Sequence, residues 1–204
     1  MNMEEKLEFD LASAVLALGD ARRVEEESKC ADVIKCTRIS TILGDMTACA
    51  TDSGICLLEF DDSRRVPAQL QRLQKKTGAT LQIGRHRHLS VLRQELKRYL
   101  AGKLREFSLP RAFSGTDFQC AVWKALVQVD YGRTINYPAL AKAAGNPAAV
   151  RAAGAANGAN PLSLLVPCHR VVGTGGSLIG YGGGIERKRW LLSLEAGRRE
   201  PSIW

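Results

Sequence analysis

Residues 137–159, YPALAKAAGNPAAVRAAGAANGA, decide the fold expected for the second half of this 204-residue chain. Residues 137–145 and 147–159 each have the composition of a short helix, and Gly145-Asn146 supplies a turn signal between them. Two short helices joined by a tight, glycine-containing turn are the pattern of a helix-turn-helix, which an ordinary helical hairpin shares. The segment therefore predicts a helix pair and leaves its function open.

The second of these helices carries little side-chain bulk. Alanine and glycine occupy most of its positions, and we expect only Val150, Arg151 and Asn157 to project. Such a helix either packs tightly against a neighbour or brings its backbone close to a ligand, with Arg151 as its one long side chain. The residues alone favour a solvated arginine and do not exclude the ligand.

Further helical patterns flank the pair. Residues 116–129, TDFQCAVWKALVQV, begin with the capping-type Thr116 and place apolar residues on one face. Residues 109–115, LPRAFSG, have the composition of a linker, and residues 184–197, GIERKRWLLSLEAG, predict another helix near the C-terminus.

The first half of the chain alternates strand and helix patterns. Short β-leaning runs between Thr37 and Asp62 are separated by Gly-Asp and Ser-Gly turn signals. Helical spacing follows over residues 66–78 and 88–102, with a strand-like run at residues 79–84 between them. This order of elements favours a small α/β unit.

These patterns predict a two-domain fold. The N-terminal domain, residues 36–108, is expected to be α/β, with a small mixed or antiparallel sheet and helices. The C-terminal domain, residues 109–204, is expected to be mainly α-helical and to contain the helix-turn-helix. Residues 1–35 look like a separate extension in which a helix is plausible, and their role is unknown.

The composition favours a polyanionic partner and no membrane. The formal net charge is +8 and the pI is near 9.4, and lysine and arginine neutralise phosphates. No run approaches the ~18 apolar residues that a membrane span needs. The N-terminal MNMEEKLEFD is acidic where a secretion signal is basic, so we expect a soluble intracellular protein.

Cysteine and histidine spacing predicts neither disulfides nor a metal. The six cysteines include no C-x-x-C pair, and no secretory context favours a disulfide framework. His86 and His88 lie close in sequence, but no cysteine pair at a ligand-like spacing accompanies them. A basic surface turn is the favoured interpretation of the two histidines.

Residues 164–172, LLVPCHRVV, place a thiol, an imidazole and a guanidinium side by side in an apolar run that has the pattern of a buried strand. A cysteine in such a run is usually an inert small hydrophobe. A neighbouring base such as His169 makes Cys168 a candidate nucleophile instead. Adjacent strand residues point opposite ways, so contact between the two requires a turn or a bridging water, and Pro167 restricts the backbone there.

Two downstream features add to this candidate site. Glu195 falls in the last turn of its expected helix, where the helix dipole disfavours a carboxylate, and this hints at a specific partner beside the alternative of a surface residue. Residues 173–184, GTGGSLIGYGGG, contain seven glycines and one aromatic residue, Tyr181. Such a segment is either a flexible loop or a backbone that approaches a flat ligand.

Together these motifs resemble the O6-alkylguanine-DNA alkyltransferases, also called methylated-DNA–protein-cysteine methyltransferases. The similarity runs from about Cys36 to Glu195, and several motifs in the same order make it very specific. The segments that carry it are TILGDMTACATDSGICLLEF, GTDFQCAVWKAL, YGRTINYPALAKAAGNPAAVRAAGAA, NPLSLLVPCHRVVG and GSLIGYGGGIERKRWLLSLE.

The resemblance implies a role for each residue of the thiol site. Cys168 would be the nucleophile and the final alkyl acceptor. His169, oriented by Glu195, would draw the thiol proton through a water, and Asn160 would hold the turn that presents Cys168. Tyr137 would turn the phosphate of the target nucleotide and donate a hydrogen bond to the guanine.

The resemblance also implies a DNA surface and a guanine pocket. Arg151 would enter the duplex in place of the extruded base, on a helix whose small residues press into the minor groove. The remaining implied contacts are Ala152 and Asn157, beside Tyr137, on the DNA side, and Tyr181, Gly182, Gly183, Val166 and Pro167 in the pocket. Some relatives have serine where this chain has Gly182, which predicts a roomier pocket and leaves only a backbone N–H to serve the guanine O6.

The implied function is direct-reversal DNA repair, in which each molecule accepts one alkyl group irreversibly. We expect no cofactor, no metal, a monomer acting on double-stranded DNA that bears O6-alkylguanine, and a cytoplasmic location with access to the nucleoid. Three alternatives remain: a damage-sensing DNA-binding protein without transfer chemistry, a helix-turn-helix regulator, and a thiol hydrolase that turns over without duplex DNA.

Overall fold

The structure, a computed structural model, describes residues 10–20, 33–62 and 65–198 of the chain. Four strands of the N-terminal half form one sheet in the order β3-β2-β1-β4. They are β1 (Val33–Thr41), β2 (Gly44–Thr51), β3 (Gly54–Phe60) and β4 (Thr80–Ile83). β1 and β3 each pair antiparallel with β2, while β4 runs parallel to β1, so the predicted mixed sheet is confirmed.

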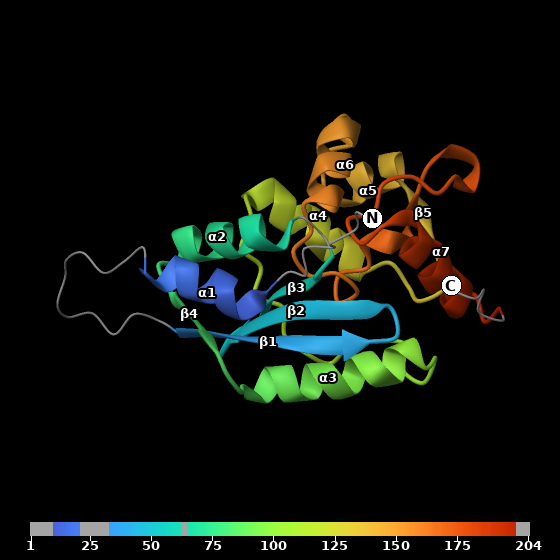
Figure 1. Ribbon diagram of the computed structural model, residues 1–204. Helices are drawn as coiled ribbons and strands as arrows, with labels where there is room; N and C mark the ends of the chain where they lie inside the picture. Colours follow the sequence, from blue (N-terminus) through green and yellow to red (C-terminus); the bar gives the residue numbers. More distant parts are fainter. Residues whose placement is uncertain (1–9, 21–32, 63–64, 199–204) are drawn as a thin grey trace, which may run out of the picture.

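Helices cover both faces of this sheet. α1 (Leu11–Asp20) and α2 (Val66–Thr77) lie on one face, and α3 (Arg87–Leu100) lies on the other (Figure 1). Successive strand residues point to opposite faces, so Ala48 packs with the cluster that contains α3 while Cys49 packs with α1 and α2. The helix predicted at residues 66–78 ends as expected, because Gly78 takes the left-handed conformation that closes it.

The described part of the N-terminal extension is not separate from the rest of the chain. Leu11 and Val15 of α1 are buried in the same cluster as Ile34 of β1. Removing these apolar side chains from water favours docking of the helix on the sheet. The expectation of a separate segment therefore fails for α1, because a short apolar stripe gives no sign of what it packs against.

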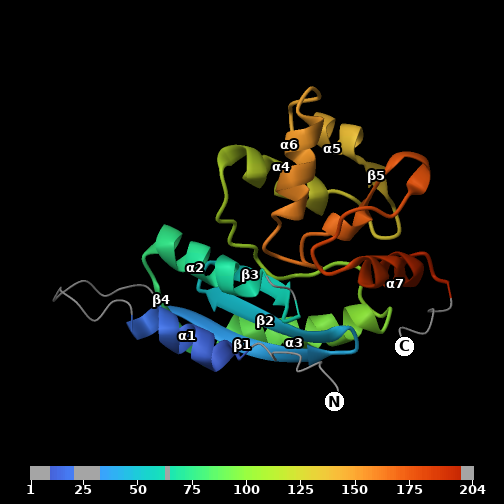
Figure 2. The same ribbon diagram turned by 45° about the horizontal axis from the view of Figure 1, so that its top comes forward.

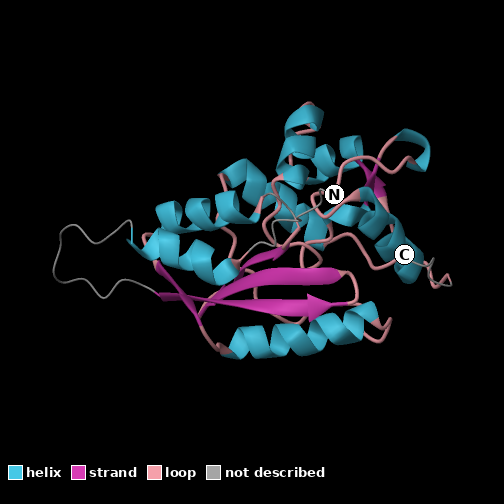
Figure 3. Cartoon of the chain, in the orientation of Figure 1, coloured by secondary structure: helices cyan, strands magenta, loops and turns pink. Residues whose placement is uncertain are grey.

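Helices and loops make up most of the C-terminal half (Figure 3). The helices are α4 (Asp117–Val127), α5 (Tyr137–Ala143), α6 (Val150–Gly158) and α7 (Ile185–Glu195). Two short parallel strands, β5 (Ile135–Asn136) and β6 (Val171–Val172), pair beside them. The turn around Gly145 joins α5 to α6, which confirms the predicted helix pair, and Thr116 caps α4 through a reciprocal bond with Gln119.

The buried strand expected over residues 164–172 is wrong. Residues 168–170 form a single turn of 3₁₀-helix with Pro167 at its start, and only the two residues of β6 are extended. Leu164 has a φ of 70°, which a strand does not accommodate. An apolar run does not distinguish a strand from another buried conformation. In residues 164–172 the hydrogen-bond partners of the backbone determine its conformation.

One edge of the sheet carries the segment that leads into this turn. Leu58 of β3 accepts from the Ser163 N–H at 2.8 Å and donates to the Pro161 carbonyl at 2.8 Å. Residues 161–163 thus act as a short extra strand that covers the edge of β3, where unpaired backbone groups would otherwise meet water. Figure 2 shows the C-terminal half seated over this side of the sheet. The sheet therefore fixes the backbone a few residues before Cys168.

A glycine at the start of β3 tests this packing. Gly54 has a φ of +141°, and a Cβ there would lie 2.4 Å from the Pro110 carbonyl oxygen. Gly78 also has a positive φ, +72°, but its Cβ would meet nothing within 4 Å. We expect Gly78→Ala to cost about 1–2 kcal/mol for the left-handed backbone alone, and Gly54→Ala to cost about 3 kcal/mol or more.

Urea unfolding of the two variants measures the difference. Equal losses of unfolding free energy would contradict the close contact between β3 and the linker.

Candidate active site

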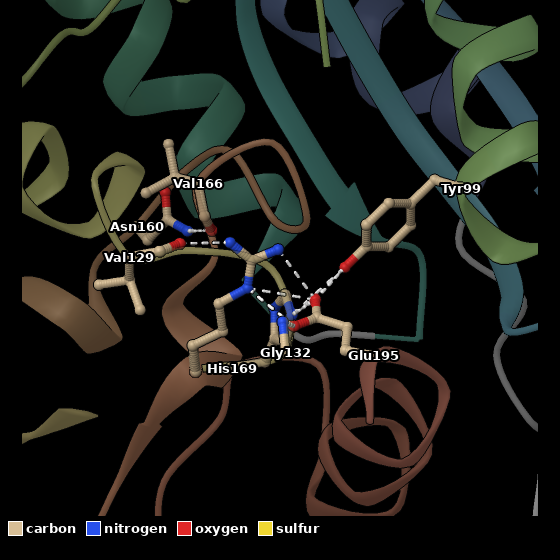
Figure 4. Close-up of polar contacts among 8 residues, drawn as sticks. Tyr99, Val129, Gly132, Asn160, Val166, His169 and Glu195 are labelled. Atoms are coloured by element: carbon tan, nitrogen blue, oxygen red, sulfur yellow. Dashed lines mark hydrogen bonds and ion pairs between the residues drawn. The ribbon is translucent and has the colours of Figure 1, made fainter. Parts of the chain in front are cut away.

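Asn160 holds the 3₁₀ turn that contains Cys168 in place. Its Nδ2 donates to the Val166 carbonyl at 3.0 Å and lies 3.1 Å from Cys168 Sγ, while its Oδ1 accepts from the Leu162 N–H at 2.9 Å. Figure 4 shows Asn160 beside Val166. The buried amide of Asn160 therefore connects the two sides of the loop and contacts the sulfur. Cys168 itself is only 4% exposed.

His169 and Glu195 form a fully buried pair. His169 Nε2 lies 2.7 Å from Glu195 Oε1, and both side chains are inaccessible to solvent. An ionised carboxylate accepts only, so Nε2 donates and the proton of the neutral ring lies on that nitrogen. His169 Nδ1 is enclosed and has no hydrogen-bond partner among the described residues, which leaves it as the nitrogen able to accept a proton.

Glu195 also binds groups from three other segments. Arg170 Nε donates to Oε2 at 2.9 Å, and Arg170 Nη2 donates to Oε1 at 3.0 Å. The Gly132 N–H donates to Oε2 at 3.0 Å. The hydroxyl of Tyr99 donates to Oε1, and Figure 4 shows Tyr99 reaching toward the carboxylate from α3. The carboxylate at the end of α7 is thus fully hydrogen-bonded.

Sequence reasoning missed most of these partners. It gave Arg170 no role and did not consider Tyr99 or Gly132 at all. A buried tyrosine hydroxyl needs a partner, and Tyr99 follows Leu96 on the apolar face of α3, so that position contained a usable signal. The partner itself lies 96 residues away in sequence, and no local pattern identifies it.

The surroundings of the pair favour an ionised Glu195 and a neutral His169. Burial alone would raise the pKa of Glu195, but the hydrogen bond from His169 and the hydrogen bonds and charge of Arg170 outweigh it and hold that pKa well below its usual range. Burial lowers the pKa of His169 despite the attraction of Glu195, and the nearby charge of Arg170 adds to the lowering. At neutral pH the site therefore combines a carboxylate with a neutral imidazole.

Cys168 is a neutral thiol in this environment. Burial raises its pKa to about 11, although the hydrogen bond from Asn160 acts in the opposite direction. The charge of Glu59 also raises it, while Arg65 and Lys188 lower it. A thiol with this pKa is not ionised at rest and needs a base at the moment of reaction.

The glycine-rich segment closes one side of the site. The Tyr181 ring lies edge-on to His169 with centroids 6.2 Å apart, and its enclosed hydroxyl has no hydrogen-bond partner among the described residues. Lys188 fixes the segment from α7, because its Nζ donates to the Val171 and Ile179 carbonyls at 2.6 and 2.7 Å. The Tyr181 hydroxyl is thus a buried polar group without a hydrogen-bond partner among the described residues.

The extra room predicted beside Gly182 is partly filled from the other domain. A Cβ at Gly182 would lie 1.7 Å from Arg65 Nη1, so the guanidinium occupies the space of the absent side chain. Arg65 also donates to the Asn160 carbonyl at 3.3 Å and lies 3.5 Å from Glu59 Oε2. Arg65 therefore takes up part of the room expected beside Gly182. At Gly183, a Cβ would collide with Phe60 and Tyr181, so the backbone is pressed onto β3.

Some of the predicted DNA contacts on the helix pair are exposed, and one is buried. Arg151 and Ala152 are exposed on α6, and Tyr137 lies 3.5 Å from the Cβ position of Gly154, between α6 and the glycine-rich segment. The prediction that Asn157 projects is wrong, because this residue is 4% exposed. It follows Ala153 by four residues on the face of α6 that packs inward, which a helix this rich in alanine does not reveal from sequence.

Within the described ranges, no group of three or more His, Cys, Asp or Glu side chains is arranged to hold a metal ion. His86 instead caps α3, where its Nδ1 accepts from the His88 N–H at 3.2 Å. No helix in the described part of the chain is long and apolar enough to cross a membrane.

Two family descriptions match consecutive parts of the chain. Residues 34–113 match "6-O-methylguanine DNA methyltransferase, ribonuclease-like domain", and residues 117–197 match "6-O-methylguanine DNA methyltransferase, DNA binding domain". The chain belongs to the 6-O-methylguanine DNA methyltransferase family.

Individual relatives agree with this assignment. The methylated-DNA–protein-cysteine methyltransferase of Mycobacterium tuberculosis (strain H37Rv) is 54% identical over 109 residues, which are 53% of this chain and 66% of the relative. The inducible protein of that name from Bacillus subtilis is 54% identical over 101 residues, which are 50% of this chain and 56% of that protein. The chain thus matches less than two thirds of the length of these curated relatives.

A solved structure covers more of the chain. The crystal structure of Mycobacterium tuberculosis OGT in complex with DNA is 38% identical, with a TM-score of 0.68 over 84% of this chain and 96% of that one.

The buried carboxylate gives a pH-dependent stability prediction. Glu195→Gln leaves Arg170 without its charge partner, so we expect a loss of about 3 kcal/mol at pH 7. The depressed pKa of Glu195 contributes stability that is fully present above the unfolded pKa and is lost as pH falls toward the folded value. The difference in unfolding free energy between wild type and variant should then narrow by about 1.4 kcal/mol per pH unit below about pH 4.

Unfolding free energies from pH 3 to pH 7 measure this gap. Glu186→Gln removes an exposed carboxylate from the same helix and should change stability by less than about 0.5 kcal/mol. A gap for Glu195→Gln that stays constant with pH would refute the ionised, paired state of this residue.

Proposed function

We propose that this protein repairs O6-alkylguanine in duplex DNA by moving the alkyl group irreversibly to Cys168. The observation that carries the proposal is the short turn in which Asn160 contacts the Cys168 thiol and the next residue, His169, forms a buried pair with Glu195. The names of the family and its relatives support the same reaction. A buried neutral thiol beside a base is suited to a nucleophile that acts when substrate is in place.

The first step is removal of the thiol proton. His169 Nδ1 has no protein partner among the described residues and is the acceptor, with a water between it and the sulfur. The imidazolium that forms is stabilised by Glu195, which already accepts the Nε2 proton. Because burial raises the pKa of Cys168 to about 11, the thiol keeps its proton until His169 removes it during the reaction.

The second step is displacement at the alkyl carbon. The sulfur lone pair forms the S–C bond while the C–O6 bond breaks, and its electron pair goes to the guanine. Tyr137 and the backbone of Gly182 and Gly183 donate hydrogen bonds that stabilise the charge that develops on the leaving base. Val166, Pro167 and Tyr181 line the pocket around it. The product is a thioether, which water does not cleave, so each molecule acts once.

DNA recognition is proposed for the exposed side of α6. The alkylated base must leave the stack before the thiol reaches it, at a cost of a few kcal/mol, roughly. Arg151 fills the space that the base vacates, and the small side chain of Ala152 lets the helix enter the minor groove. The net charge of +8 favours the phosphate backbone. Asn157 has no part in this surface because it is buried.

The proposal also defines what the reaction requires. The thiol supplies both the electron pair and the final acceptor, so the step needs no cofactor. We propose that the protein acts as a monomer on its duplex substrate, in the cytoplasm, where the nucleoid is accessible.

Intact-protein mass spectrometry tests the proposal directly. After incubation with a duplex that carries one O6-methylguanine, the protein should gain a single methyl group, located on the peptide with Cys168. Cys168→Ser should gain none. Cys120→Ser, which removes another free thiol from the same half of the chain, should still be methylated.

The other outcomes separate the alternatives. Tight binding without a mass change indicates a damage sensor or regulator, and turnover of substrate without duplex DNA indicates a thiol hydrolase. Either result would overturn the transfer proposal.

The role of Arg151 gives a second prediction. Arg151→Ala should slow transfer from a duplex by about 10–100-fold, because nothing then offsets the cost of extruding the base. Transfer from the free base O6-methylguanine should change little, since no extrusion is needed. Single-turnover kinetics on both substrates measure the two rates.

Arg98→Ala is the matched control for charge. It removes one exposed arginine from α3, on the far face of the sheet, and should leave the duplex rate within about twofold. Equal slowing of duplex and free-base transfer in Arg151→Ala would contradict a role in extrusion.

A further inference from the structure

Tyr99 is a buried polar group that the mechanism above does not use. It belongs to α3, which packs on the N-terminal sheet, and its side chain is fully buried. Its hydroxyl donates to Glu195 Oε1 and lies 3.4 Å from His169 Nε2 (Figure 4). A residue from one domain thus enters the hydrogen-bond network of the other.

Tyr99 and His169 bind the same carboxylate oxygen. Oε1 of Glu195 accepts from His169 Nε2 at 2.7 Å and from the Tyr99 hydroxyl. Arg170 Nη2 donates to it as well, and each further donor withdraws negative charge from this oxygen and weakens its attraction for a proton on the imidazole. Burial and the charge of Glu195 raise the pKa of Tyr99, so the phenol keeps its proton and remains a donor.

Aromatic packing holds the ring in position. The Phe107 ring lies 4.9 Å from that of Tyr99, and the Tyr131 ring meets it edge-on at 6.0 Å between centroids. These contacts belong to the ring and not to the hydroxyl. Replacement by phenylalanine therefore removes the donor and keeps most of the packing.

We propose that Tyr99 is a positioning residue through which the N-terminal domain lowers the proton affinity of His169. The inference rests on the proposed function and deepens it. A histidine that stays neutral near pH 7 is ready to accept the thiol proton, whereas one held as an imidazolium is not. The N-terminal domain would then control the base of the reaction as well as the loop that carries the thiol.

Other charged and titratable groups surround His169 and set the background for this effect. Glu195 and Lys188 face it from α7, and Arg170 follows it in the 3₁₀ turn. The Tyr181 ring lies edge-on from the glycine-rich segment, and Cys168 precedes it in the chain. None of these groups changes in a Tyr99 variant, so a shift at His169 reports the lost hydroxyl.

The test is the pKa of His169 in Tyr99→Phe, measured by NMR of ¹⁵N-histidine-labelled protein. The chain contains three histidines, which keeps the spectrum simple. We expect this pKa to rise by about 0.5–1 unit relative to wild type. The rising limb of the pH–rate profile for methyl transfer should move to higher pH by the same amount.

Two comparisons separate positioning from structural support. Tyr131→Phe deletes a hydroxyl from the neighbouring ring, and no hydrogen bond to Glu195 involves it in the described part of the chain, so its His169 pKa should match wild type. Tyr99 replaced by 3-fluorotyrosine donates more strongly and should lower the His169 pKa. This second variant keeps the proposal testable if Tyr99→Phe does not fold.

The outcomes are distinct from those of the proposed function. The NMR titration needs no DNA, so it stands even if no methyl group is transferred. An unchanged His169 pKa in a folded Tyr99→Phe protein, with or without a fall in thermal stability, would overturn the inference. Normal transfer by wild type in the same series would leave the proposed function intact.

Discussion

The ionised carboxylate of Glu195 is the interaction on which the site depends. A buried charge is tolerated only when it is paired and hydrogen-bonded, and this one accepts from Arg170, His169, Tyr99 and the Gly132 backbone. These groups come from the 3₁₀ turn, from α3 and from the turn before β5. Satisfying one carboxylate thus requires the two domains and the 3₁₀ turn at residues 168–170 to be assembled together.

A second set of contacts constrains the 3₁₀ turn at residues 168–170. Residues 161–163 pair with the edge of β3, and Asn160 ties the Val166 carbonyl to the sulfur of Cys168. The thiol is thereby fixed in an apolar, water-poor site that keeps it protonated. In the proposed single-use reaction this arrangement is an advantage, because a neutral thiol reacts slowly with other electrophiles before the substrate arrives.

Local signals account for the part of the fold that the sequence predicts. Gly78 ends α2 and Thr116 begins α4 because capping depends on a few adjacent residues. The α5–α6 pair is predicted for the same reason. The strand expected over residues 164–172 fails because its conformation depends on Asn160 and on β3, and Asn157 is misjudged because an alanine-rich helix does not show its buried face.

Long-range contacts account for what the sequence does not predict. Cys168 and His169 are adjacent and visible as a candidate site, but the role of Glu195 came from family resemblance and one weak hint in its helix position. Arg65 and Tyr99 reach the site across 95 and 96 residues, from elements with no pattern that marks them as functional. Only the assembled fold shows that the N-terminal domain contributes side chains to the site.

Burial keeps Cys168 a neutral thiol in the resting protein, so no thiolate is present before a substrate binds. The pH dependence of its alkylation by iodoacetamide, quantified on the peptide that contains Cys168, tests this most directly. With a pKa of about 11, the rate should keep rising nearly tenfold per pH unit through pH 9, without a plateau. A plateau at or below pH 8 would show a preformed thiolate and contradict the account.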